Sequence, residues 1–148
     1  MAKLYRELTI VEIEQMKGVR YEGIIIESAL TIWYDQIRLK KLCDLTDGDI
    51  ARCIRQEIFL DYTIDEALYR IALDPFVGEQ YDGEIIFNLA KLDKDFWAMN
   101  TDILERVEHV IKNIDHNLID AFEWLSIEEK TEYCNIIRTL LNAFEKMK

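Results

Sequence analysis

Apolar residues recur at intervals of three and four along most of the chain, the spacing that places side chains on one face of an α-helix. The last segment shows this best, because Ser126 and Glu129 are spaced as a capping box at its start. The apolar stripe that follows consists of Tyr133, Ile137, Leu140, Leu141 and Phe144. No segment alternates apolar and polar residues long enough to predict a strand, although Gly23-Ile24-Ile25-Ile26 has β-propensity. The pattern predicts an all-α fold.

Two helices are expected in the N-terminal third of the chain. Thr9 and Glu12 have capping-box spacing, and they begin a short helix that Gly18 ends. A second helix is expected to end near Cys43, because apolar residues from Ile25 onward keep helical spacing.

Five more helices follow from the turn signals in the rest of the chain. A third helix begins in the turn 44–49. A fourth is expected to be capped by Asp61 or Thr63. It ends at Asp74-Pro75, since a residue before proline avoids the helical conformation. A fifth is expected from about Asp82 to Trp97, a sixth from Thr101 to either Asp115 or beyond Phe122, and a last one after Ser126. The loop from Pro75 to Gly83 is the clearest break.

The composition supports one helical domain. The chain has 148 residues, the length of a single domain, and half of them are hydrophobic, which is enough for a core. Five Gly and a single Pro are too few for the many tight turns of a β-sandwich or barrel. We therefore expect residues 1–148 to form a single-domain, compact bundle of about seven helices.

The charge is strongly negative, with 29 acidic against 18 basic residues and a formal net charge of −11. Such a charge repels phosphate backbones and anionic membranes and attracts basic proteins, so neither nucleic acid nor membrane is expected as a partner. The segment from Met1 to Glu7 carries charge where a signal peptide needs an apolar run. Three cysteines without CxxC spacing indicate reduced core thiols: Cys43, Cys53 and Cys134. We expect the protein to work in the cytoplasm.

The sequence offers little for catalysis. The motifs GxSxG, GxxxxGK and GxGxxG do not occur in it. The best candidates for metal ligands are Glu105, Glu108, His109 and His116, but one helix supplies only half a site, and a solvated charged face is the simpler interpretation. We expect no enzyme activity, no metal and no cofactor.

Most of the excess negative charge lies between Asp44 and Glu84. This segment holds eleven acidic and three basic residues, with aromatic residues interleaved among them. Like charges at this density repel one another, which favours binding to a cationic partner. The expected partner-binding residues are Asp61, Tyr62, Asp65, Glu66, Asp74, Glu79, Tyr81, Asp82 and Glu84. The alternative left open is that these acids only cap helices and keep the protein soluble.

The same part of the chain carries a series of short motifs in a recognisable order. They are Asp44-Leu45-Thr46 with Asp49, Gln56-Glu57-Ile58 with Leu60 and Tyr62, Ala67-Leu68, Asp74-Pro75-Phe76, Gly78-Glu79, Tyr81-Asp82-Gly83-Glu84 and Phe96-Trp97. This series, within residues 39–98, resembles the helical family of immunity proteins from bacterial contact-dependent growth inhibition (CDI) systems. The sequence departs from the family at Phe59, where a small residue is usual, at Asp65, where proline is usual, and at Glu84, where aspartate is common.

The resemblance implies a helical protein in the cytoplasm of the producing cell that binds the C-terminal toxin domain delivered by a neighbour. Toxins of these systems are commonly nucleases, and a ribonuclease is one form that we expect here. The substrate channel of a nuclease is basic because it holds phosphates, so it would complement the negative charge of this chain. The hypothesis is 1:1 binding by a monomer whose acidic region from Asp61 to Glu84 covers the toxin's basic cleft, with blocking at an exosite as the close variant. The loop from Asp74 to Glu84 has an alternative role in the scaffold.

Two other classes of function stay open. An acidic regulatory adaptor or nucleic-acid mimic that binds a basic host protein, such as a repressor or polymerase subunit, would carry the same charge. A carboxylate-metal enzyme is disfavoured because the ligand pairs are missing. Gene position separates the first class from an immunity protein, whose gene should directly follow the 3′ end of a very large secreted-toxin gene.

Overall fold

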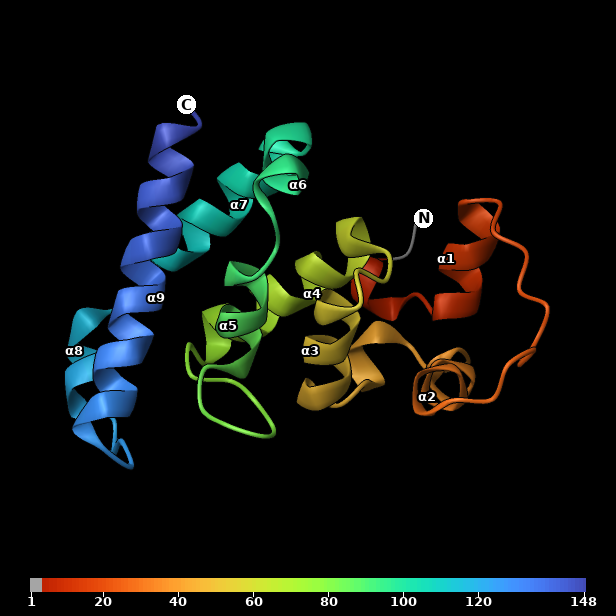
Figure 1. Ribbon diagram of the computed structural model, residues 1–148, viewed down its shortest axis with the longest axis horizontal. Helices are drawn as coiled ribbons and strands as arrows, with labels where there is room; N and C mark the ends of the chain where they lie inside the picture. Colours follow the sequence, from red (N-terminus) through yellow and green to blue (C-terminus); the bar gives the residue numbers. More distant parts are fainter. Residues whose placement is uncertain (1–3) are drawn as a thin grey trace.

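The computed structural model describes residues 4–148 and confirms an all-α fold (Figure 1). Residues 1–3, part of the charged N-terminal segment noted above, lie outside the described residues. There are two 3-10 helices, η1 (Tyr5–Glu7) and η2 (Leu42–Asp44), and nine α-helices in the described range: α1 (Ile10–Met16), α2 (Ala29–Ile37), α3 (Asp47–Arg55), α4 (Leu60–Leu73), α5 (Glu84–Ala90), α6 (Lys94–Met99), α7 (Thr101–Lys112), α8 (His116–Ala121) and α9 (Ile127–Lys146). None of these helices is long and apolar enough to cross a membrane.

Along the long axis of the molecule the helices follow roughly the order of the sequence (Figure 1). The helices α1 and α2 lie at one end, α8 and α9 lie at the other, and α3, α4 and α5 lie between them. Helix α4 packs against α3, α5 and α7, while α9 packs against α5 and α7. The exposed side chains of α4 therefore form part of the surface in the middle of the molecule.

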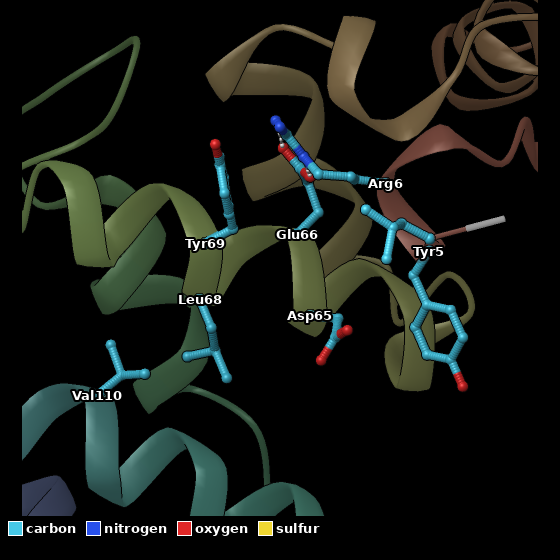
Figure 2. A pocket seen from close by; sticks show the side chains of 8 residues that line it. Tyr5, Arg6, Asp65, Glu66, Leu68, Tyr69 and Val110 are labelled. Atoms are coloured by element: carbon cyan, nitrogen blue, oxygen red, sulfur yellow. Dashed lines mark hydrogen bonds and ion pairs between the residues drawn. The ribbon is translucent and has the colours of Figure 1, made fainter.

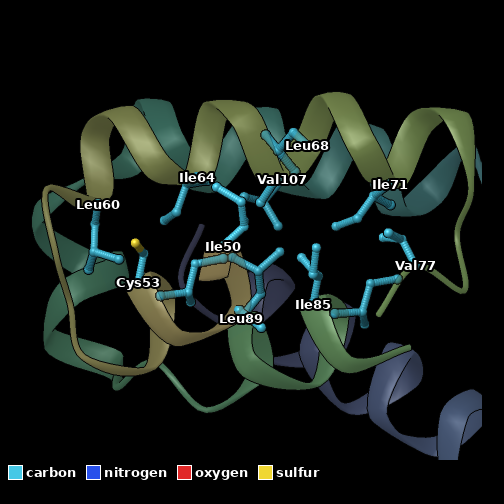
Figure 3. Close-up of a cluster of buried hydrophobic side chains, with 14 of the residues drawn as sticks. Ile50, Cys53, Leu60, Ile64, Leu68, Ile71, Val77, Ile85, Leu89 and Val107 are labelled. Carbon is cyan, nitrogen blue, oxygen red and sulfur yellow. The ribbon is translucent and has the colours of Figure 1, made fainter. Parts of the chain in front are cut away.

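The core lies where α4 faces α3, α5 and α7 (Figure 3). Ile64, Leu68 and Ile71 point inward from α4, and Ile50 and Leu89 meet them from α3 and α5. The α4 residues are three and four positions apart, as the sequence pattern requires. Burying one such side chain contributes roughly 1.5–3 kcal/mol, so this face fixes α4 in the molecule.

Side-chain caps begin two helices where the sequence predicts them. The Oγ1 of Thr9 accepts a hydrogen bond from the Glu12 backbone N–H at 3.1 Å, and the Glu12 carboxylate accepts one from the Thr9 backbone. The Oγ of Ser126 accepts one from the Glu129 backbone at 3.2 Å. The full capping box forms at the start of α1, whereas at α9 only the Ser126 side-chain cap is present; both starts lie where the sequence predicts them.

The start of α4 differs from the prediction, because neither Asp61 nor Thr63 caps it. The N-cap residue is Phe59, whose φ of 43° is in the left-handed region. The Oγ1 of Thr63 instead donates a hydrogen bond to the Ile58 carbonyl at 3.0 Å. A left-handed conformation costs a residue with a side chain about 1–2 kcal/mol. Because this cost arises from the Cβ, only a glycine at position 59 would be free of it.

The second helix is shorter than predicted. It begins at Ala29, where the Ser28 hydroxyl accepts a hydrogen bond from the Thr31 backbone at 3.1 Å. The β-prone run from Gly23 to Ile26 lies in neither helix nor strand, and its isoleucines are exposed, Ile25 by 78%. The helical spacing predicted from Ile25 onward therefore does not mark a buried helix face at Ile25.

Two predicted helices are each divided in two, which accounts for nine α-helices within residues 4–148 where about seven are expected. The stretch expected as the fifth helix forms α5 and α6, because the Asp93 carboxylate accepts a hydrogen bond from the Phe96 backbone and starts a new helix. The sixth ends at Lys112, and Asp115 caps the separate helix α8 through the Asn117 backbone.

Candidate functional site

The nine predicted partner-binding residues do not form one cluster. Three lie on the first half of α4 and four lie in the loop after it: Asp61, Tyr62 and Asp65, then Asp74, Glu79, Tyr81 and Asp82. Helix α4 continues to Leu73, so roughly 13 Å of helix lies between Asp65 of the first group and Asp74 of the second. The remaining two, Glu66 and Glu84, are buried and belong to neither group.

Glu66, one of the expected partner-binding residues, is buried and serves as an internal ion-pair partner. Its buried carboxylate accepts a hydrogen bond from the Nε of Arg6 at 2.9 Å and from the Nε of Arg70 at 2.7 Å. Arg70 also donates to the carbonyls of Leu42 and Leu45 at 3.1 and 2.8 Å. This network ties η1, η2 and α4 together. Because a buried carboxylate needs paired charge, Glu66 is held inside the protein.

Glu84, the other buried residue among those expected to bind the partner, also has a structural role. Its Oε1 accepts hydrogen bonds from the backbone N–H groups of Glu79 at 2.9 Å and Gln80 at 3.2 Å. Gly78 allows the chain to pass closely at this point, because a Cβ there would lie 2.2 Å from the Tyr81 carbonyl oxygen. Glu84 therefore fixes the loop from inside, as the alternative scaffold role of this loop requires.

Asp74 shapes the beginning of the loop. Its Oδ1 accepts a hydrogen bond from the Phe76 backbone N–H at 2.9 Å. Directly after it, the Pro75 carbonyl accepts one from the buried Tyr133 hydroxyl at 2.8 Å. Asp74 is exposed, but its position serves the turn first.

Three of the predicted residues, Glu79, Tyr81 and Asp82, are exposed on this fixed loop. Tyr81 is 43% exposed, and its ring lies edge-on to Phe87 with the ring centroids 5.7 Å apart. The Glu79 side chain lies against Gly48 at the start of α3. A Cβ added at Gly48 would come within 2.2 Å of the Oε2 of Glu79. The N-terminal end of a helix dipole favours such a carboxylate. The loop therefore presents ordered side chains.

Glu132 of α9 adds a residue that the sequence did not indicate. The loop packs against α9 at Gly83, whose φ is 80° and where a Cβ would lie 2.8 Å from the Tyr133 ring. Burial raises the pKa of Tyr81, the charge of Glu84 raises it further, the charge of Arg55 lowers it, and the charge of Glu132 raises it, so an acid of α9 and a cation of α3 both act on this ring. The acidic loop face is defined as Glu79, Tyr81, Asp82 and Glu132. Within residues 4–148 its three carboxylates form no salt bridge.

The acids at the start of α4 are paired. Asp61 forms a salt bridge of 2.8 Å with Lys17, whose Nζ lies 5.6 Å from the centre of the Tyr62 ring, and Asp65 forms one with Arg106. Partly exposed pairs of this kind contribute only about 0–1 kcal/mol to stability. They do neutralise the carboxylates, so this end of α4 offers less free negative charge than the acidic loop face.

A groove runs along α4 on the side of α7. Its first hollow, of about 420 Å³, lies between η1, α4 and α7, with Leu68 and Val110 among its apolar walls (Figure 2). A second hollow of about 540 Å³ shares both of these residues, and a third of about 270 Å³ shares Val110 and His109 with the second. The three hollows therefore follow one another along α7, and we term them the α4–α7 groove.

The candidate metal ligands of α7 and α8 do not converge. Glu108 is buried and forms a salt bridge of 2.5 Å with Lys148, which lowers the pKa of Glu108. Glu105, His109 and His116 are exposed. In the part of the chain that the structure describes, no three His, Cys, Asp or Glu residues are grouped as metal ligands.

A comparison with protein families identifies a match. The profile of a family described as CDI immunity proteins matches residues 12–107. This span begins in α1 and ends in α7, so it contains α4 and most of the acidic loop face. It confirms the family resemblance within residues 39–98 and extends it in both directions. A comparison with curated proteins gives no match.

Proposed function

Because the chain belongs to the family of CDI immunity proteins, we propose that it binds the toxin domain of its cognate CDI effector and neutralises it. We expect one chain to bind one toxin domain, in the cytoplasm, and to act by binding rather than by turnover. The finer proposal concerns the toxin and the contact surface. We take the toxin to be a basic nuclease and the acidic loop face to be the part of this chain that meets its substrate cleft.

One observation supports the acidic loop face above the other acids. Glu79, Asp82 and Glu132 form no salt bridge within residues 4–148, whereas Asp61 and Asp65 do and Glu66 and Glu84 are buried. Exposed carboxylates without a cation of their own gain most from a cationic partner. We therefore take these three acids of the loop face as the groups that replace phosphate groups in a basic cleft.

The loop is also suited to tight binding because it is ordered before the partner arrives. Glu84 holds the backbone at Glu79 and Gln80, and Phe87 supports the Tyr81 ring. A surface that is already ordered loses less conformational entropy on binding. A partly exposed tyrosine adds a large contact area at low entropic cost. Tyr81 is the expected anchor among the three acids.

The experiment uses two charge-reversal variants that change the net charge equally. Glu79→Lys with Asp82→Lys alters the acidic loop face, and Glu22→Lys with Glu27→Lys alters exposed acids between α1 and α2, far from the loop (Figure 1). Each is tested for protection of cells that produce the adjacent-gene toxin domain and for the association rate with that domain. Helicity is checked by circular dichroism.

The proposal expects the loop variant to lose protection and to associate more slowly, most clearly at low salt, while the control variant behaves like the wild type. Equal rates and equal protection for the two variants would move the interface away from the loop. A wild-type chain that neither protects nor binds the toxin would overturn the immunity function itself. Retained substrate binding by the toxin in the complex would indicate the exosite variant.

A further inference from the structure

The outward face of α4 is apolar near its C-terminal end. Tyr69 is 45% exposed and Leu73, one helical turn later, is 73% exposed, with Ala72 exposed beside them. An exposed apolar stripe on a central helix marks a contact surface more often than a lone exposed residue does. We term Tyr69, Ala72 and Leu73 the α4 ridge.

Hollows flank the α4 ridge on both sides. On one side lies the first hollow of the α4–α7 groove, which Tyr69 lines together with Leu4 and Tyr5 (Figure 2). On the other side lies a hollow of about 650 Å³, which Tyr69 and Leu73 also line. The ridge therefore stands between two hollows, so a partner can place side chains against both of its sides.

Tyr69 is held in place before any partner binds. The Arg6 guanidinium lies 3.8 Å from the centre of the Tyr69 ring, and Arg6 is itself fixed by its 2.9 Å pair with Glu66. A cation over an aromatic face contributes about 0.5–1 kcal/mol at an exposed site. The ring therefore loses little freedom when it is covered.

The charges around the ridge are negative on balance. The cations Arg6 and Arg70 beside the ridge are both paired, with Glu66 and with Asp47 and Glu66 respectively. In the next hollow of the α4–α7 groove, Asp102 and Glu105 form no salt bridge within residues 4–148. Glu79 lines the hollow on the far side, so the ridge is continuous with the acidic loop face. A partner on this surface must supply apolar side chains at its centre and cations at its rim.

We propose that the α4 ridge and the hollows beside it dock an amphipathic segment of the toxin domain, with apolar side chains in the first hollow of the α4–α7 groove and Lys or Arg toward Glu79 in the polar hollow on the other side. This inference rests on the proposed immunity function. A second copy of this chain fits the surface poorly, because a symmetric pair would bring the same acidic rim against itself. The ridge supplies the apolar anchor and the acidic loop face supplies the charge.

The test removes the apolar side chains without changing charge. In the variant Tyr69→Ser with Leu73→Ser, the dissociation constant for the toxin domain should rise roughly 30-fold or more. The rise should come mainly from faster dissociation, with the salt dependence of association unchanged. Tyr69→Phe keeps the ring and should bind like the wild type. The control Ile25→Ser with Met99→Ser removes side chains that are 78% and 83% exposed elsewhere, and it should leave binding unchanged.

A photo-reactive benzoylphenylalanine at position 73 identifies the occupant. The expected product joins it to a toxin segment that contains both apolar and basic residues. A wild-type chain that binds toxin while the double variant binds equally well would overturn this inference and leave the immunity function standing. A crosslink to a second copy of the chain in the presence of toxin would also overturn it. Absence of toxin binding by the wild type would overturn both.

Discussion

The Nε of Arg70 donates a hydrogen bond of 2.7 Å to the Oε2 of Glu66, one turn earlier on the same helix. The pair turns an acid within the most negative part of the sequence into a structural group. Arg70 extends the contact to Asp47 at 2.9 Å, so α4 is joined to the start of α3. Net negative charge in a stretch of sequence therefore overstates the negative charge that a partner meets.

Replacement of Glu66 by alanine should lower the free energy of unfolding by about 3–5 kcal/mol, because Arg6 and Arg70 lose the carboxylate that pairs them and Arg70 is mostly buried. Urea denaturation monitored by circular dichroism measures the change. The matched control is Asp65→Ala, one residue earlier, whose partly exposed pair with Arg106 should cost about 1 kcal/mol or less. Similar losses in the two variants would mean that the Glu66 network contributes no more to stability than the exposed pair of Asp65 with Arg106.

The loop that carries the acidic face should depend on Gly83. Gly83→Ala places a Cβ at a φ of 80° and 2.8 Å from the Tyr133 ring, so it should cost more than about 2 kcal/mol from strain and overlap together. Gly18→Ala has a similar φ of 68° but no atom within 4 Å of the added Cβ, so it should cost about 1–2 kcal/mol. Thermal and urea unfolding of both variants compare the two costs. An equal loss would show that the contact with Tyr133 is not close.

Stability should fall in acid, and part of the fall should come from Glu14. Burial raises the pKa of this carboxyl, but hydrogen bonds from Arg38 and Tyr34 outweigh burial and hold the pKa below its ordinary value. A lowered folded-state pKa gives stability that is present above the unfolded value of about 4.3 and is lost as the pH falls through the folded value. Urea unfolding between pH 7 and 3 should show a smaller decline for Glu14→Gln than for the wild type, and identical slopes would contradict the assignment.

The three thiols should differ in reactivity. Cys53 is buried, and burial raises its pKa to about 12, whereas Cys43 and Cys134 are only partly buried. The thiolate is the reactive form. Iodoacetamide at pH 8 should therefore modify Cys43 and Cys134 in the native protein and reach Cys53 only after unfolding. Peptide mass spectrometry reads this out, and early modification of Cys53 would contradict the packing of α3.

Local signals in the sequence were enough to predict the helical class and several helix ends. Periodicity identified the buried faces of α4 and α9, and the caps at Thr9 and Ser126 located two starts, because these effects act over one or two turns. Periodicity misled where no neighbouring helix covers the side chains, as at Ile25.

The candidate surface was less predictable because it depends on distant partners. Glu66 and Asp65 are adjacent acids in the sequence, yet one is buried against Arg6 while the other is partly exposed. Only the folded arrangement of η1 and α4 separates them. The charge of Glu132 acts on Tyr81 because α9 packs on the loop at Gly83 through Tyr133, which no local pattern records.

The central claim is that this chain acts by forming a complex with a toxin domain. Isothermal titration calorimetry with the catalytically inactive toxin domain from the adjacent gene tests it most directly. The predicted result is saturable binding at one chain per toxin domain, with an affinity that falls as salt is raised. Heats no larger than dilution at micromolar concentrations of both proteins would contradict the account.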